Sequence, residues 1–82
     1  MWAYCYCLYI KDKKEVRKYI TTADFALDYC MHVKDRKEIY RIIKDSYHAY
    51  HYCRWIKDRS EVAKYITQTN LSLCYKEWKA KQ

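Results

Sequence analysis

A repeat of 23 residues runs through nearly all of the 82-residue chain, and it limits the possible folds more than any other feature of the sequence. Three units, residues 7–29, 30–52 and 53–75, align without a gap and begin CLYIKDKKEVRKYI, CMHVKDRKEIYRII and CRWIKDRSEVAKYI. Six columns are identical in all three units: Cys, Lys, Asp, Glu, Ile and Tyr. A chain of this length holds one domain, so residues 1–82 are expected to form a single domain built from these units.

Composition and apolar spacing both predict helices. The chain has no Gly and no Pro, which excludes Gly-rich phosphate-binding loops and tight β-hairpin turns. In the first unit Val16, Tyr19 and Ile20 form one helical stripe, and the polar residues 21–24 then provide a turn. A second helix follows, and its apolar side consists of Phe25, Ala26, Tyr29, Cys30 and Val33.

Each first helix has an acidic start signal. In every unit an Asp precedes a Glu by three residues, which is the spacing between an N-cap residue and the N3 residue that bonds back to it. The pairs are Asp12 with Glu15, Asp35 with Glu38, and Asp58 with Glu61. We therefore expect the three Asp side chains to cap the first helices.

Neither helix of a unit can bury its apolar stripe alone, so the units are expected to stack on one another. The predicted fold is all-α, a short α-solenoid of three 23-residue two-helix repeats. A partial helix precedes the first repeat, and residues 76–82, which include Lys76 and Lys79, are expected to form a polar C-terminal cap.

The repeat resembles the leucine-rich repeat variant family and its HEAT-like relatives, whose units run A-x-x-x-D-x-x-x-x-V-R before a capped second segment. The matching residues are Ile10-Lys11-Asp12 through Val16-Arg17, Val33-Lys34-Asp35 through Ile39, and Ile56-Lys57-Asp58 through Val62. The chain departs from the family pattern in its shorter units, in its missing Asn-Pro turn, and in having the motif Arg only as Arg17. The resemblance implies a helical array that binds other macromolecules and has no catalytic activity.

The amino-terminal segment is apolar and lacks the helix that would precede it in the stack. It contains Trp2, Tyr6 and Ile10 on a face that no other unit covers. Uncovered apolar surface on a small domain favours self-association. We therefore predict a homodimer through residues 1–10, with Trp2 and Tyr6 in the interface.

Basic residues recur in columns and contribute to a formal net charge of +7. Stacking turns each column into a ladder of cations. Two ladders are expected to bind an anionic partner: Lys11, Lys34 and Lys57, and Lys13, Arg36 and Arg59. The third ladder lies three residues after the repeated Glu column and is expected to pair with it; it consists of Lys18, Arg41 and Lys64.

Aromatic residues also fall into columns. One column lies on the core side of the second helix and is expected to pack there; it holds Tyr6, Tyr29, Tyr52 and Tyr75. Another lies partly off the apolar stripe and holds Tyr9, His32, Trp55 and Trp78. Tyr9 and Trp55 are therefore the candidates for aromatic contact with a partner.

No metal site, cofactor site or catalytic site is predicted. Cys7, Cys30 and Cys53 share a core column and are expected to be buried, inert thiols. The Cys and His spacings do not match a zinc site, and no nucleophile lies beside an oriented base, so neither enzyme activity nor a small-molecule substrate is expected. The longest uncharged apolar run, residues 1–10, spans about half a membrane. Without a secretory leader, and with five Cys, the chain is expected in the cytoplasm and not at a membrane.

Two functions fit these observations. The first is a small nucleic-acid-binding module that docks phosphates along the Lys and Arg ladders. The second is a protein-interaction module or inhibitor, of phage or mobile-element type, that uses the basic face or the aromatic amino-terminal end against an acidic host protein. Electrostatic attraction assists both, so the sequence leaves nucleic acid and acidic protein open as partners.

Overall fold

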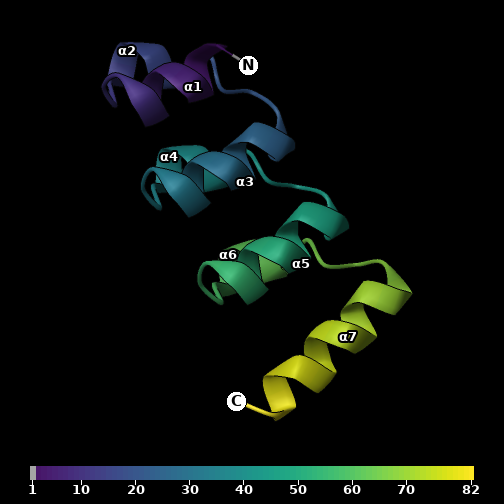
Figure 1. The fold of residues 1–82 in the computed structure, drawn as a ribbon. Helices are drawn as coiled ribbons and strands as arrows, with labels where there is room; N and C mark the ends of the chain where they lie inside the picture. The colour runs from purple at the N-terminus through teal and green to yellow at the C-terminus, as the bar shows by residue number, and fades with distance from the viewer. Residues whose placement is uncertain (1) are drawn as a thin grey trace.

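The computed structural model describes residues 2–82, and this part of the chain is all helical, with no strand. Four long helices alternate with three short ones along the chain (Figure 1). The long helices are α1 (Trp2–Tyr9), α3 (Ala23–His32), α5 (Ser46–Trp55) and α7 (Thr69–Ala80). The short helices are α2 (Lys14–Arg17), α4 (Lys37–Tyr40) and α6 (Ser60–Ala63). None of these helices has the length and apolar character needed to cross a membrane.

The helices form a staircase of pairs. Each of α1, α3 and α5 packs against the short helix that follows it and against the next long helix, which for α5 is α7. The described residues extend 39 × 21 × 17 Å, and the two ends of the chain lie at opposite ends of the long axis (Figure 1). Helices that follow the 23-residue period therefore occupy equivalent places, one step apart.

The boundaries expected for the units fall inside helices. Residues 29 and 30 lie in the second half of α3, and residues 52 and 53 lie in the second half of α5. The helix pairs are α1 with α2, α3 with α4, and α5 with α6. A period establishes how long a unit is, but any column of the alignment can serve as its start, and the real break lies in the loops that precede α3, α5 and α7.

The core follows the predicted apolar columns. Ala3, Ala26 and Ala49 are fully buried in the long helices, where a methyl side chain allows the next long helix to approach closely. Ile20 and Ile43 are at most 1% exposed, and burial of an Ile side chain contributes about 1.5–3 kcal/mol. Both columns keep their burial from one helix pair to the next, which explains why one sequence pattern builds each step.

The prediction that Asp side chains cap the short helices is wrong. The N-cap residues of α2, α4 and α6 are Lys13, Arg36 and Arg59, and none of them makes a side-chain capping bond. The Asp residues stand one position earlier, and each accepts a hydrogen bond from a Tyr of the next long helix. Among the long helices, α5 is capped as the polar turn predicts, because the Asp45 side chain accepts a hydrogen bond from the backbone N–H of His48.

The two ends of the array differ from the middle. At the amino-terminal end Trp2 is 59% exposed, and its ring lies 5.2 Å from that of Tyr19; residue 1 of the expected dimer segment lies outside the described residues. At the other end α7 is one continuous helix, so the expected cap at 76–82 is mostly its last turns. No residue of α7 is buried, and Leu73 is 54% exposed.

Candidate functional site

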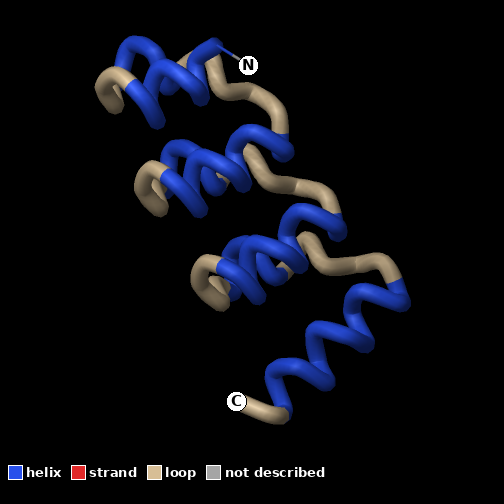
Figure 2. The backbone as a smooth tube through the Cα atoms, in the orientation of Figure 1, coloured by secondary structure: helices blue, strands red, loops and turns tan. Residues whose placement is uncertain are grey.

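Tight turns join each long helix to the short helix after it, and they stack along one edge of the molecule (Figure 2). We call this the turn edge; it comprises residues 10–13, 33–36 and 56–59. It carries all six cations of the two ladders expected to bind an anion: Lys11, Lys13, Lys34, Arg36, Lys57 and Arg59. The structure shows which of these cations are free.

Three polar side chains from two successive helix pairs hydrogen-bond to one another at the turn edge. The hydroxyl of Tyr29 donates to Asp12 Oδ1 over 2.6 Å, and Arg36 Nη2 donates to Asp12 Oδ2 over 3.0 Å. Arg36 Nε also donates to the Tyr29 hydroxyl oxygen over 2.9 Å. We call this Asp–Tyr–Arg arrangement a clasp, because the Asp belongs to one helix pair and the Tyr and Arg belong to the next.

The pKa values in the first clasp reflect these bonds. Burial alone would raise the pKa of Asp12, but hydrogen bonds from Tyr29, Arg17 and Arg36 outweigh it and hold the pKa below its ordinary value. Burial, with the hydrogen bond to Asp12, raises the pKa of Tyr29. The bonds to Tyr29 and Asp12 raise the pKa of Arg36. The clasp is therefore an ionised carboxylate held by a neutral phenol and a cation.

A second clasp repeats the first one, 23 residues later. Tyr52 donates its hydroxyl proton to Asp35, and Arg59 donates to both Asp35, at 2.9 Å, and the Tyr52 oxygen, at 2.9 Å. The Arg59 guanidinium also lies 4.8 Å from the centre of the Tyr40 ring, a cation–π contact. Tyr52 is fully buried, so its hydroxyl needs the partner that the clasp supplies.

The third clasp has an Asp and a Tyr but no Arg. Tyr75 donates to Asp58, as its two counterparts do. Gln82 stands 23 residues after Arg59, where the chain offers no charge, and Lys79 instead approaches Asp58 with its ammonium 3.4 Å from the carboxylate. The Lys79 side chain is 61% exposed, so this ion pair is weak.

The clasps correct the interpretation of the second ladder. Arg36 and Arg59 were expected to bind an anionic partner, but each is bonded to a Tyr of its own helix pair and to an Asp of the preceding one. The other ladder differs. Lys11, Lys34 and Lys57 are exposed, and none of them forms an ion pair within residues 2–82.

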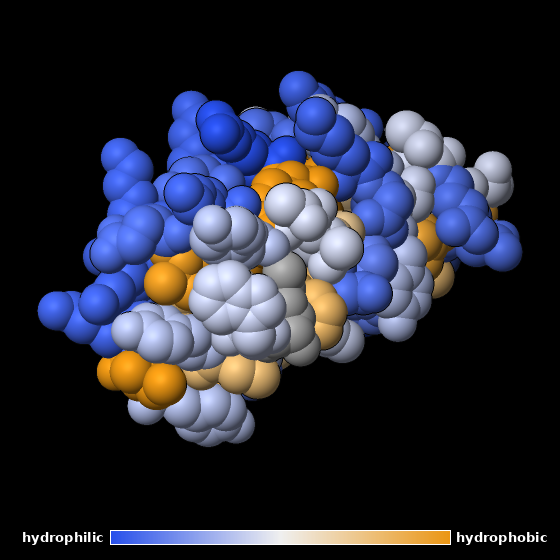
Figure 3. Space-filling view, turned by 90° about the horizontal axis from the view of Figure 1, so that it is seen from above, coloured by the Kyte–Doolittle hydropathy of each residue, from blue (hydrophilic) through white to orange (hydrophobic). Residues whose placement is uncertain are grey.

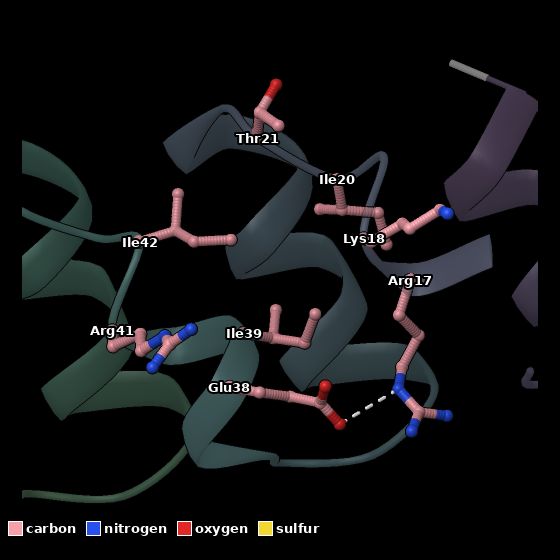
Figure 4. A pocket seen from close by; sticks show the side chains of 8 residues that line it. All are labelled: Arg17, Lys18, Ile20, Thr21, Glu38, Ile39, Arg41 and Ile42. Carbon is pink, nitrogen blue, oxygen red and sulfur yellow. Dashed lines mark hydrogen bonds and ion pairs between the residues drawn. The ribbon is translucent and has the colours of Figure 1, made fainter. Parts of the chain in front are cut away.

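The third ladder also differs from expectation. Lys18, Arg41 and Lys64 make no ion pair with the Glu column in the described part of the chain. Instead Glu38 accepts a bond of 3.0 Å from Arg17 Nε (Figure 4). A second nitrogen of Arg17 donates to Asp12 over 3.0 Å. The Arg17 side chain reaches this acid from the preceding helix pair, which an argument from spacing along one helix does not consider.

Open grooves separate the short helices on the face where the third ladder lies. The first has a volume of 370 Å³ and lies between α2 and α4 (Figure 4). Its polar lining is Arg17, Lys18, Thr21, Glu38 and Arg41. The second has a volume of 600 Å³ and is lined by Thr21, Arg41, Ile42, Lys44 and Tyr65. We call these two the short-helix grooves; Arg41 lines both of them.

Two aromatic rings stand beside cations of the third ladder. The Lys18 ammonium lies 5.3 Å from the centre of the Tyr19 ring, and the Lys64 ammonium lies 5.3 Å from the centre of the Tyr65 ring. Tyr19 is 49% exposed, and Tyr65 is half-buried beside the second groove. Rings beside cations are the groups on which single-stranded bases stack. Sequence reasoning missed these residues because it assigned Tyr19 to the core and the Lys column to ion pairs.

The predicted aromatic contacts, Tyr9 and Trp55, lie at the carboxy-terminal ends of their long helices, next to the turn edge. Tyr9 is 79% exposed at the end of α1, and Trp55 is 57% exposed at the end of α5. Each precedes an exposed Lys of the first ladder by two residues. The column of Tyr6 is confirmed as a packing column at its centre, where Tyr29 and Tyr52 are fully buried, whereas Tyr6 itself is half-buried.

The cysteine column is buried, as predicted. Cys7, Cys30 and Cys53 are 2–5% exposed, and burial raises the pKa of Cys30 to about 12 and that of Cys53 to about 11. Such thiols stay protonated and unreactive at neutral pH. Within residues 2–82 no group of His, Cys, Asp and Glu side chains is arranged to hold a metal ion.

A histidine that follows no column joins two long helices. His48 Nδ1 lies 2.7 Å from Asp45, and His48 Nε2 bonds to Asp24 at the start of α3. Burial lowers the pKa of His48, but the bonds to both carboxylates raise it by a larger amount, so the net shift is upward. Phe25 and Leu71 occupy the equivalent positions, so the repeat contained no signal for this contact.

Comparisons with known proteins found no matching family model, no matching curated protein and no matching solved structure. Function must therefore be inferred from the chain's own geometry.

Proposed function

We propose that this protein is a non-enzymatic binding module, a short α-solenoid whose short-helix grooves bind single-stranded nucleic acid. The observation that carries the proposal is the third ladder, in which Lys18, Arg41 and Lys64 recur at equal steps with no ion pair within the described residues. A regular row of free cations along a 39 Å molecule suits a polymer with one negative charge per unit.

Charge is distributed unevenly between the two faces, which also favours the short-helix side. Arg54 is the only Lys or Arg in α1, α3 and α5, whereas every short helix and its flanking loops carry several cations. Lys44 adds a further cation to the second groove. An anionic polymer would therefore be attracted to the face on which the grooves lie.

The tyrosines beside the ladder favour single strands over duplex. Bases of a single strand are free to stack on Tyr19 and Tyr65 while phosphates contact Lys18 and Lys64, whereas in a duplex the bases already stack on one another. Lys18 and Lys64 would contact phosphates, and the Tyr rings would contact base faces, neither of which encodes sequence, so binding is expected to be tolerant of sequence.

A second candidate function is binding of an acidic protein at the turn edge. It is favoured by exposed Tyr9 and Trp55 beside exposed Lys11 and Lys57, because aromatic rings next to cations are common anchors of protein interfaces. The two functions use different surfaces, so matched substitutions distinguish them.

Fluorescence anisotropy with short single-stranded and duplex oligonucleotides, over a series of salt concentrations, tests the proposal. The groove variant carries Lys18→Glu, Arg41→Glu and Lys64→Glu; the turn-edge variant carries Lys11→Glu, Lys34→Glu and Lys57→Glu and makes the same change in net charge. We expect the unaltered protein to bind single strands more tightly than duplex. The groove variant should lose at least about tenfold more affinity than the turn-edge variant, and loss of three phosphate contacts should lower its salt slope by about 2.

Three other outcomes would contradict the proposal or change the assigned site. An unaltered protein that binds neither oligonucleotide would overturn the proposal. A turn-edge variant that loses more affinity than the groove variant would move the nucleic-acid site to Lys11, Lys34 and Lys57. Retention of a stoichiometric acidic protein by the groove variant, but not by the turn-edge variant, would support the second function.

A further inference from the structure

The clasp has a half-formed copy at the amino-terminal end of the array. Tyr6 and Lys13 stand 23 residues before Tyr29 and Arg36, and the Lys13 ammonium lies 6.0 Å from the centre of the Tyr6 ring. The complete clasps take their Asp from the turn of the preceding helix pair. Within residues 2–82 no carboxylate occupies that place, and the Tyr6 hydroxyl has no hydrogen-bond partner.

The segment that carries this half-clasp also exposes apolar side chains. Trp2 is 59% exposed, Ile10 is 71% exposed, and the Trp2 ring packs against Tyr19 at 5.2 Å. Figure 3 views the molecule from the end that carries α1 and α2. Pale and orange side chains gather on one part of this end, and strongly hydrophilic ones lie along another side. The face thus combines an apolar area with an unmatched cation and an unmatched hydroxyl donor.

We infer that this amino-terminal face is a docking surface for a different protein, one that presents a helix followed by an acidic turn. The partner's helix would pack on α1 as α1 packs on α3, and its Asp or Glu would accept from the Tyr6 hydroxyl and pair with Lys13. Each element of this arrangement already exists twice in the molecule, in the clasps of Asp12 and Asp35. The surface meets the short-helix side at Tyr19, which contacts Trp2, but Tyr6 and Lys13 line neither groove, so the inference does not depend on nucleic-acid binding.

A second copy of the chain does not supply this chemistry in a head-to-tail stack. The position 23 residues after Asp58 is Lys81, so the carboxy-terminal end would bring a cation toward Lys13 instead of a carboxylate. Lys76 and Lys79 add further positive charge to α7. Like charges at this junction oppose stacking of copies, and charge complementarity favours an acidic partner.

A tethered probe tests the inference with the full chain. A copy of residues 24–46 is joined ahead of residue 1, because residue 47 is equivalent to residue 1 and the copied Asp35 would then face Tyr6 and Lys13. Tethering gives a millimolar effective concentration, so even weak docking is detected. The matched control carries Asp35→Asn in the copied segment only.

Amide hydrogen exchange of α1 (residues 2–9) is the readout. The Asp probe should slow exchange in α1 at least about tenfold relative to the Asn probe, and Tyr6→Phe together with Lys13→Met should abolish that difference. Equal exchange with the two probes would overturn the inference. Sedimentation of the unextended protein is the second measurement: a concentration-dependent dimer that Trp2→Ala abolishes would assign the face to a second copy and overturn the inference too.

Discussion

Two basic ladders of the same chain have opposite roles. The Arg members of one ladder, Arg36 and Arg59, each bond to a Tyr of their own helix pair and to an Asp of the preceding pair, and so join successive pairs. Arg41 belongs to the other ladder, makes no ion pair within the described residues, and lines both short-helix grooves. Both ladders recur every 23 residues, so periodicity alone does not distinguish a structural cation from a free one.

The difference follows from what each cation can reach. A long side chain at the start of a short helix lies beside the preceding turn, where an Asp and a buried Tyr hydroxyl converge. A cation just after the end of a short helix, such as Lys18 or Arg41, faces a groove and solvent. Bonded cations therefore mark the joints between helix pairs, whereas free ones lie on open surface, and the two kinds are expected to respond differently to substitution.

The largest expected effect is loss of a clasp carboxylate. Asp35→Ala leaves Tyr52 and Arg59 without their acceptor, and we expect it to lower the free energy of unfolding by about 2–3 kcal/mol. Arg41→Ala removes a cation with no ion-pair partner among the described residues and should change stability by less than about 0.5 kcal/mol. Urea denaturation followed by circular dichroism compares the two. Similar losses in both variants would contradict the assignment of different roles to the ladders.

A smaller effect compares a buried clasp with an exposed one. Tyr52→Phe removes one hydroxyl that donates to Asp35 and accepts from Arg59 in a fully buried ring, and we expect a loss of about 1.5 kcal/mol. Tyr75→Phe removes the equivalent hydroxyl at the exposed end, where the loss should be about 0.5 kcal/mol. The same denaturation measurement applies, and a larger loss at Tyr75 than at Tyr52 would be inconsistent with this ranking.

Much of the fold could be predicted from the sequence because local patterns determine it. Apolar residues three and four apart predict the helices, and the buried columns of Cys7 and Tyr29 behave as their repetition indicates. The absence of Gly and Pro agrees with a described chain that has helices and no strand. These features require knowledge of near neighbours only.

The joints between helix pairs could not be predicted by the same means. The Asp–x–x–Glu spacing fits an N-cap, but Asp12 bonds to residues 17 and 24 positions away, and these outcompete the local backbone N–H. One signal was available: a Tyr in a core column needs a partner for its hydroxyl, and an invariant Asp and a basic residue recur at the same period. The Arg17–Glu38 pair occurs at one step only, so periodicity offered no signal for it.

The smallest expected effect concerns a joint that occurs once. His48 ties α5 to Asp24 of α3, and its raised pKa means that the folded state favours the charged ring. The ordinary pKa of His is about 6.5. The stabilisation is therefore complete below about pH 6.5 and is lost as pH rises through the higher pKa of the folded state.

His48→Phe provides the measurement, because Phe25 already occupies the equivalent position in the preceding helix pair. The unaltered protein should exceed this variant in stability by about 0.5–1 kcal/mol more at pH 5.5 than at pH 9, a small effect because both carboxylates are largely exposed. Burial, with repulsion from charged His48, lowers the pKa of His51. The burial effect is common to both chains, whereas the repulsion is absent from the variant and makes the expected difference smaller. Asp24→Asn should reduce the pH dependence without removing the ring. A stability difference between the two chains that is the same at both pH values would show that His48 joins the helices by packing and not by charge.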